Sequence, residues 1–137
     1  MTLVKKIDHV AITVKDLDTA VKTFTSNFGF PVDRIGEVPQ LNIRRAFLSI
    51  GDASLELFQP TSEKNPGTKF LAERGEGMYL LSFEVDDLNA AVEALRQKGV
   101  QVSVQNVAGG PRLGFVSPKA AHGVLVQLIE HAKDSGR

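Results

Sequence analysis

The chain lacks three features that would each point to a class of protein. It has no cysteine, so disulfide bonds, thiolate metal sites and a cysteine nucleophile are excluded. Its 16 basic and 16 acidic residues cancel without any basic cluster, so nothing favours binding to nucleic acid or to an anionic membrane surface. No segment approaches the run of about 18 apolar residues that a membrane span needs, and the first residues lack the apolar stretch of a signal peptide. We expect a cytoplasmic protein that binds neither nucleic acid nor membrane.

The length and composition are those of one globular domain. A chain of 137 residues, of which 42% are hydrophobic and 23% charged, can bury a substantial core. We therefore expect a single domain that spans residues 1–137.

The sequence contains an internal repeat. The stretch "IDHVAITVKDLDTAVKTF" (7–24) is matched by "MYLLSFEVDDLNAAVEAL" (78–95). Adding 71 to a residue number takes Val14 to Val85 and Asp16 to Asp87, and it also aligns "LELF" (55–58) with "VQLI" (126–129). The repeat units are predicted at residues 5–60 and 76–130, joined by a polar linker at 61–75.

Each repeat predicts a strand, then a helix, then further strands. The first helix should begin after a cap at Asp16, run from Leu17 to Phe28 and stop at Gly29. The second should follow a cap at Asp86 or Asp87 and end before Gly99. Runs of β-branched and aromatic residues predict strands at 9–14, 44–50, 53–60, 80–85, 112–118 and 123–130.

These patterns indicate an α+β fold. We expect duplicated βαβββ modules that form a curved, partly closed β-barrel cup with helices outside, and a small-molecule site within the cup. The repeat places His9, Glu56, Leu80 and Gln127 at four equivalent strand positions. Four such positions in a duplicated barrel could hold a divalent metal, if all four carried N or O ligands.

The chain resembles the vicinal oxygen chelate superfamily, which includes glyoxalases, extradiol dioxygenases and bleomycin-resistance proteins. Within it the chain is similar to methylmalonyl-CoA epimerases. The resemblance rests on "DHVAITVKDLDTAV", "LELFQPT", "GEGMYLLSFEVDDLNAAV" and "FVSPKAAHGVLVQL", which span nearly the whole chain. It implies a divalent metal, an acyl-CoA substrate and a homodimer.

The chain departs from that family's pattern in its second half. The pattern has histidine at the positions of His9 and Leu80, glutamine or glutamate at Glu56, and glutamate at Gln127. It also tends to carry an acidic residue, implicated in proton transfer, in the strand where this chain has Arg45. The resemblance thus implies the fold of an epimerase, although the chain lacks some of that family's metal ligands and catalytic bases.

Three functions stay open at this stage. The first is an epimerase-like isomerase or lyase that moves a proton next to a carbonyl, on an acyl thioester or a polyketide-type substrate, without the usual metal. The second is a metal-free protein that binds and sequesters a small molecule, as bleomycin-resistance proteins do. The third is a metal-dependent epimerase whose divalent ion (Co, Ni, Mn, Zn or Mg) is held by His9, Glu56 and Gln127.

We expect no cofactor under the first two functions. The predicted catalytic residues are Glu56, His9 and Arg45, although the adjacent Arg44 and Arg45 must face opposite ways and the sequence does not say which one faces the cup. The predicted substrate-binding residues are Gln127, Leu80, Phe47, Phe58 and Lys119.

Overall fold

A computed structural model describes residues 3–132, and the chain divides into two compact units. One unit comprises His9–Tyr79. The other joins the residues up to Asp8 with those from Leu80 onward. Within the described residues, the longest helix has only 12 residues, and no helix is both long and apolar enough to cross a membrane.

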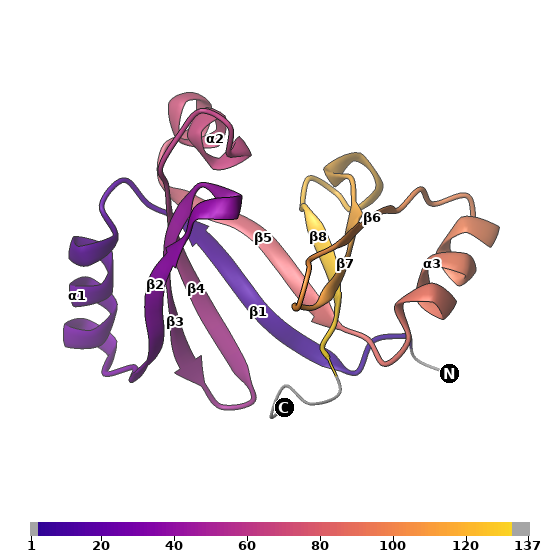
Figure 1. Cartoon of the computed structure of the whole chain (residues 1–137), viewed down its shortest axis with the longest axis horizontal. Helices are drawn as coiled ribbons and strands as arrows, with labels where there is room; N and C mark the ends of the chain where they lie inside the picture. The colour runs from indigo at the N-terminus through magenta and orange to yellow at the C-terminus, as the bar shows by residue number, and fades with distance from the viewer. Residues whose placement is uncertain (1–2, 133–137) are drawn as a thin grey trace. The chain divides into compact units, whose positions relative to one another are not determined.

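The unit His9–Tyr79 contains a four-stranded sheet with a helix packed on it (Figure 1). Its strand order is β2-β3-β4-β1, where β1 runs parallel to β4 and the other pairs are antiparallel. The elements are β1 (Lys6–Thr13, from His9 onward in this unit), α1 (Leu17–Phe28), β2 (Val32–Val38), β3 (Ile43–Ile50), β4 (Ala53–Pro60) and α2 (Pro66–Arg74), with a short 3₁₀ turn at Pro39–Leu41. The core between α1 and the sheet consists of Val14, Leu17, Ala46, Leu48, Leu55 and Leu57.

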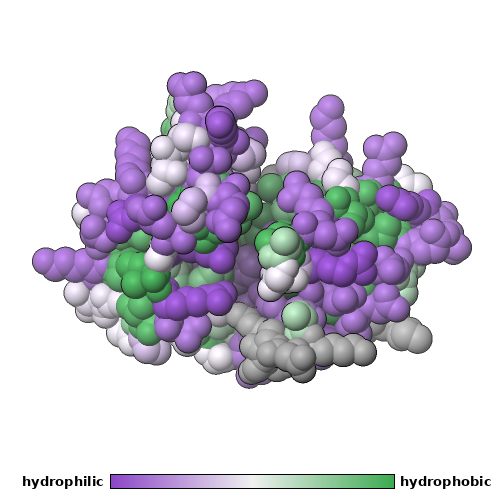
Figure 2. Space-filling view, viewed as in Figure 1, coloured by the Kyte–Doolittle hydropathy of each residue, from purple (hydrophilic) through white to green (hydrophobic). Residues whose placement is uncertain are grey.

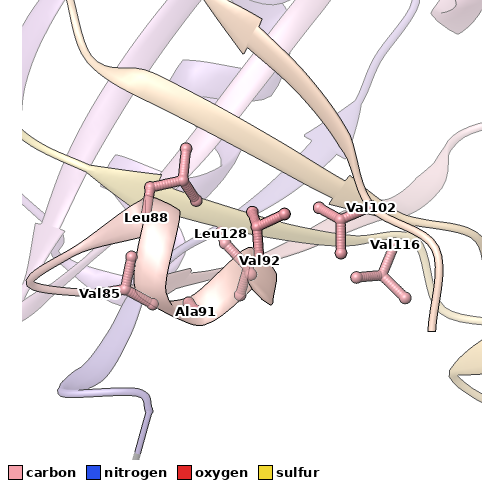
Figure 3. Close-up of a cluster of buried hydrophobic side chains, with 7 residues drawn as sticks. All are labelled: Val85, Leu88, Ala91, Val92, Val102, Val116 and Leu128. Carbon is pink, nitrogen blue, oxygen red and sulfur yellow. The ribbon is translucent and has the colours of Figure 1, made fainter. Parts of the chain in front are cut away.

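The other unit repeats this arrangement. Its strand order is β5-β8-β7-β6, and β5 runs parallel to β8. The elements are β5 (Gly77–Glu84, from Leu80 onward in this unit), α3 (Leu88–Gln97), β6 (Ser103–Asn106), β7 (Arg112–Val116), a 3₁₀ turn (Pro118–Ala120) and β8 (Val126–Glu130). Figure 3 shows the core under α3, formed by Val85, Leu88, Ala91, Val92, Val102, Val116 and Leu128.

The repeat extends to individual backbone hydrogen bonds. The N–H of Val14 donates to the carbonyl of Phe58 at 2.9 Å, and the N–H of Val85 donates to the carbonyl of Ile129 at 2.9 Å. Both residues of the second bond lie 71 positions after those of the first. The strands within each unit therefore pair in the same register. The predicted α+β fold with two βαβββ modules is confirmed.

The predicted helix boundaries are also confirmed. The side chain of Asp16 accepts hydrogen bonds from the first turn of α1, and Gly29 ends the helix with a φ of 77°. A left-handed φ of this kind is the reason glycine suits that position. Of the two candidate caps for the second helix, Asp87 is the one that caps α3.

The sequence did not identify β2 and β6 individually. Nearly every residue of β2 and all four of β6 are exposed. Each strand lies at the end of its unit's strand order, where it has only one neighbour, so its residues lack the alternation of a half-buried strand.

The face of the molecule drawn in Figure 2 is largely polar. On this face, hydrophilic residues predominate and hydrophobic ones gather in separate patches. Such scattered apolar surface is ordinary for a folded chain.

Candidate active site

Three predicted catalytic residues come together within the unit His9–Tyr79. His9 on β1 places Nε2 3.5 Å from Oε1 of Glu56 on β4. Arg45 on β3 places Nη1 3.6 Å from the other carboxylate oxygen, Oε2. His9 and Glu56 are both buried, with 6% and 8% of their surface exposed. Buried charged groups need partners of this kind, because burial removes the hydration of a carboxylate.

The structure also decides between the two adjacent arginines. Arg44 points toward α1, where its Nη2 lies 3.4 Å from Oδ1 of Asp18. Arg45 lies on the opposite face of β3, with Glu56. Arg45 is therefore the arginine that shares a sheet face with the predicted base.

Phe47 forms an aromatic surface beside these groups. It is buried, and the ring of His9 meets it edge-on at a centroid distance of 5.8 Å. The guanidinium carbons of Arg45 and Arg34 lie 5.1 and 4.4 Å from the centre of the same ring. Guanidinium groups at such distances are attracted to the electron-rich face of an aromatic ring.

The charges of this cluster act on one another. Burial lowers the pKa of Arg45, nearby Glu56 raises it, and the positive charge of Arg34 lowers it. An arginine stays protonated through such shifts, because its ordinary pKa lies so far above neutral pH. Arg45 thus remains a cation that can stabilise a negative charge near Glu56.

A recess of about 160 Å³ adjoins the cluster. It is lined by residues 34–38 of β2 together with Arg45 and Phe47. Gly36 is in register with Arg45, and a Cβ added at Gly36 would meet nothing within 4 Å. Gly36 and Arg45 both line the recess, and the missing side chain at Gly36 leaves its side of the recess open.

The remaining predicted residues Gln127 and Leu80 lie in the other unit. Ser82, fully buried on β5, donates its hydroxyl proton to Oε1 of Gln127 on β8 at 2.7 Å. This bond uses the amide oxygen, so the NH₂ group of Gln127 remains as a donor. Leu80 is buried with 8% of its surface exposed and offers no ligand atom.

Phe58 and Lys119 have different surroundings. Phe58 is buried and meets the ring of Tyr79 edge-on, with the centroids 5.2 Å apart. Tyr79 contacts Phe70 of α2 in the same way, and burial raises the pKa of Tyr79. Lys119 is exposed in the 3₁₀ turn Pro118–Ala120. Binding of substrate by Phe58 and Lys119 stays a prediction.

A second cluster of ionisable groups was not found from the sequence. In the unit that contains Leu80, Nε2 of His131 lies 2.7 Å from Oδ1 of Asp8, and Glu84 is close enough for all three to offer ligand atoms within 4.8 Å of one another. Lys5 lies 3.8 Å from Glu84 and 3.1 Å from Asp86, and its hydrogen bond to Asp86 raises its pKa. The Lys5 ammonium already balances part of this negative charge, so we interpret the cluster as an ion-pair network.

Comparison with known proteins places the chain in a family. The sequence pattern of the Glyoxalase/Bleomycin resistance protein/Dioxygenase superfamily matches residues 8–116, which is most of the chain. The chain belongs to this superfamily. The expected resemblance is therefore confirmed.

Several relatives in the superfamily are methylmalonyl-CoA epimerases. The mitochondrial enzyme of Homo sapiens is 32% identical over 127 residues, which cover 90% of this chain and 72% of the human protein. The crystal structure of the epimerase from Mycobacterium tuberculosis superimposes with a TM-score of 0.90 at 33% identity, covering 99% of this chain and 94% of that one. Another similar structure, with a TM-score of 0.86 and 33% identity over 95% of this chain and 96% of that one, is a methylmalonyl-CoA epimerase in complex with methylmalonyl-CoA and NH₄⁺.

Proposed function

We propose that this chain is an isomerase that moves a proton at the carbon next to the carbonyl of an acyl thioester. The observation that carries the proposal is the buried contact of Glu56 with both His9 and Arg45. It brings a base, a proton carrier and a cation together in a chain whose relatives include methylmalonyl-CoA epimerases. The geometry supports proton transfer coupled to stabilisation of an enolate.

The proposed reaction starts with Glu56 as carboxylate. Glu56 takes the proton from the α-carbon, the C–H electron pair forms the enolate, and Arg45 stabilises the negative oxygen. Because His9 lies 3.5 Å from Glu56, both groups act on the same face of that carbon. A water molecule gives a proton to the opposite face, which inverts the carbon. The proton on Glu56 passes through His9 to solvent and neutralises the hydroxide that the water leaves, so the cycle leaves the number of protons unchanged.

We further propose that the reaction needs no metal. A divalent ion held by His9, Glu56 and Gln127 would have to compete with Arg45 for the Glu56 carboxylate, while the Ser82 hydroxyl already uses one of the two lone pairs of the Gln127 amide oxygen. The equivalent position in the repeat, Leu80, supplies no donor. Divalent ions prefer sites with several anionic or imidazole ligands and no nearby cation, so this set of donors does not fit one.

The test is exchange of the α-proton of methylmalonyl-CoA with deuterated water, measured by mass spectrometry. Glu56→Gln should slow exchange by about 10²–10⁴-fold, as expected for loss of a general base, while the thioester still binds. Glu63→Gln is the matched control, because Glu63 is an exposed glutamate in the same unit. Full exchange in Glu56→Gln would refute the role of Glu56. Binding without exchange by the unaltered protein would favour the sequestering function instead.

The proposal that the reaction needs no metal has a separate test. Exchange by the unaltered protein should be unchanged after treatment with a chelator. Loss of exchange that is restored by cobalt or nickel would overturn this part and would favour the metal-dependent epimerase.

A further inference from the structure

The guanidinium groups of two arginines lie over one aromatic ring, that of Phe47, at the edge of the recess. We propose that Arg34 and Arg45 form a subsite for a carboxylate on the acyl part of the substrate, an inference that rests on the proposed function. Sequence patterns gave no reason to single out Arg34, which lies on the exposed strand β2. Its role follows from its position over Phe47.

Strand pairing holds the two guanidinium groups around the recess. Arg34 is in register with Phe47, and Gly36 is in register with Arg45. The guanidinium groups of both arginines lie over the ring of Phe47, and Gly36 and Arg45 both line the recess. Stacking on a buried ring restricts the guanidinium groups, which lowers the entropy that is lost when they bind an anion.

The charges around the recess favour an anion. Among residues 3–132, Arg34 makes no ion pair with an acidic side chain, and its guanidinium lies over the ring of Phe47. Glu37 is the one acidic residue in the lining, against two arginines. Burial lowers the pKa of Arg45 most and the positive charge of Arg34 lowers it further; an anion between the two guanidinium groups would offset this second effect.

The guanidinium of Arg45 also keeps N–H donors that can bind a further acceptor. Its contact with Glu56 is 3.6 Å long, whereas charge-assisted N–H···O bonds are about 2.7–2.9 Å. A carboxylate bound in the recess could accept shorter bonds from Arg34 and Arg45 and draw Arg45 toward itself. Glu56 would then lose part of its ion pair when the substrate is bound.

Size and position indicate a carboxylate of the acyl group rather than a phosphate of the coenzyme. A recess of about 160 Å³ has room for a carboxylate and a few carbon atoms. Because Arg45 touches both the recess and Glu56, a group bound there lies close to the reacting carbon. In an acyl-CoA the long pantetheine arm separates the phosphates from that carbon.

The test compares binding of malonyl-CoA, propionyl-CoA and free coenzyme A by isothermal titration calorimetry. Malonyl and propionyl groups have similar size, and neither thioester has a stereocentre that turnover could invert. The unaltered protein should bind malonyl-CoA about tenfold or more tightly than propionyl-CoA. In Arg34→Gln this preference should fall to about twofold or less, with little change for propionyl-CoA or free coenzyme A.

Arg44→Gln is the matched control. Arg44 lies beside Arg45 on β3 but faces α1, so its replacement removes the same charge without touching the recess. The control should keep the preference for malonyl-CoA. Equal losses in both variants would show a general charge effect and overturn the subsite, and so would equal binding of malonyl-CoA and propionyl-CoA by the unaltered protein. Weaker binding of free coenzyme A by Arg34→Gln would assign Arg34 to a phosphate instead and overturn it too.

The subsite and the proposed function can fail separately. Proton exchange that depends on Glu56, without any preference for malonyl-CoA, would overturn the subsite alone. A preference that depends on Arg34, without proton exchange, would support the subsite and refute the isomerase.

Discussion

Two equivalent contacts at the starts of α1 and α3 allow a matched test of how the repeat is stabilised. The N–H of Leu88 donates to Oε1 of Glu130 at 2.7 Å, and the N–H of Leu17 donates to Oε1 of Gln59 at 2.9 Å. Both leucines are fully buried. Replacing either acceptor by alanine would leave a donor at a helix N-terminus without its partner.

The expected cost differs between the two sites because one acceptor is charged. Glu130→Ala should lower the free energy of unfolding by about 2–3 kcal/mol, since it removes a charge-assisted hydrogen bond and a favourable interaction with the helix dipole. Gln59→Ala should cost about 1–2 kcal/mol, the value for a neutral bond to a partly buried donor. Glu130→Gln should keep the bond and cost about 1 kcal/mol or less.

Urea unfolding followed by far-UV circular dichroism measures these differences, provided that the slope against urea concentration stays constant. Domains of this size have a stability of about 5–15 kcal/mol, so losses of this size are easily resolved. The reasoning would be refuted if Glu130→Ala cost no more than Gln59→Ala, or if Glu130→Gln were as damaging as Glu130→Ala.

Three further predictions follow from single contacts. Burial raises the pKa of Tyr79, so its contribution to stability is complete below pH 10 and is lost as pH rises through the raised pKa. Because it is the single tyrosine, tyrosinate absorbance should titrate above pH 10, and a midpoint at or below 10.0 would contradict this. Gly67→Ala should destabilise by about 1–3 kcal/mol, since the new Cβ would lie 2.7 Å from the ring of Phe58; an unchanged melting temperature would contradict this. Ser82→Ala leaves the buried oxygen of Gln127 without its donor and should cost about 1–3 kcal/mol in urea unfolding, whereas a neutral result would show that the bond contributes little.

Much of the architecture could be predicted from the sequence, because local signals agree with the repeat. The capping side chain of Asp16, the left-handed Gly29 and the apolar stripe between them set the limits of α1 before any tertiary contact is considered. The same residue types recur in the second half. Strands β2 and β6 were not predicted individually, because their residues are almost all exposed.

The candidate site, too, could be predicted only in part from the sequence. The repeat and the family resemblance singled out His9 and Glu56 as candidate site residues. The alternation of side chains along a strand required Arg44 and Arg45 to lie on opposite faces of the sheet. Which arginine joins Glu56 depends on how β3 pairs with β4, and the position of Arg34 over Phe47 depends on how β2 pairs with β3.

The sequence by itself therefore determined the two modules, their helices and the residues of interest on each strand. Only the tertiary structure decided which side chains meet: Arg45 with Glu56, Arg34 with Phe47, and Ser82 with Gln127. The physical reason is that helix limits depend on residues a few positions apart. Contacts between strands depend on a register that distant segments establish only when they pair.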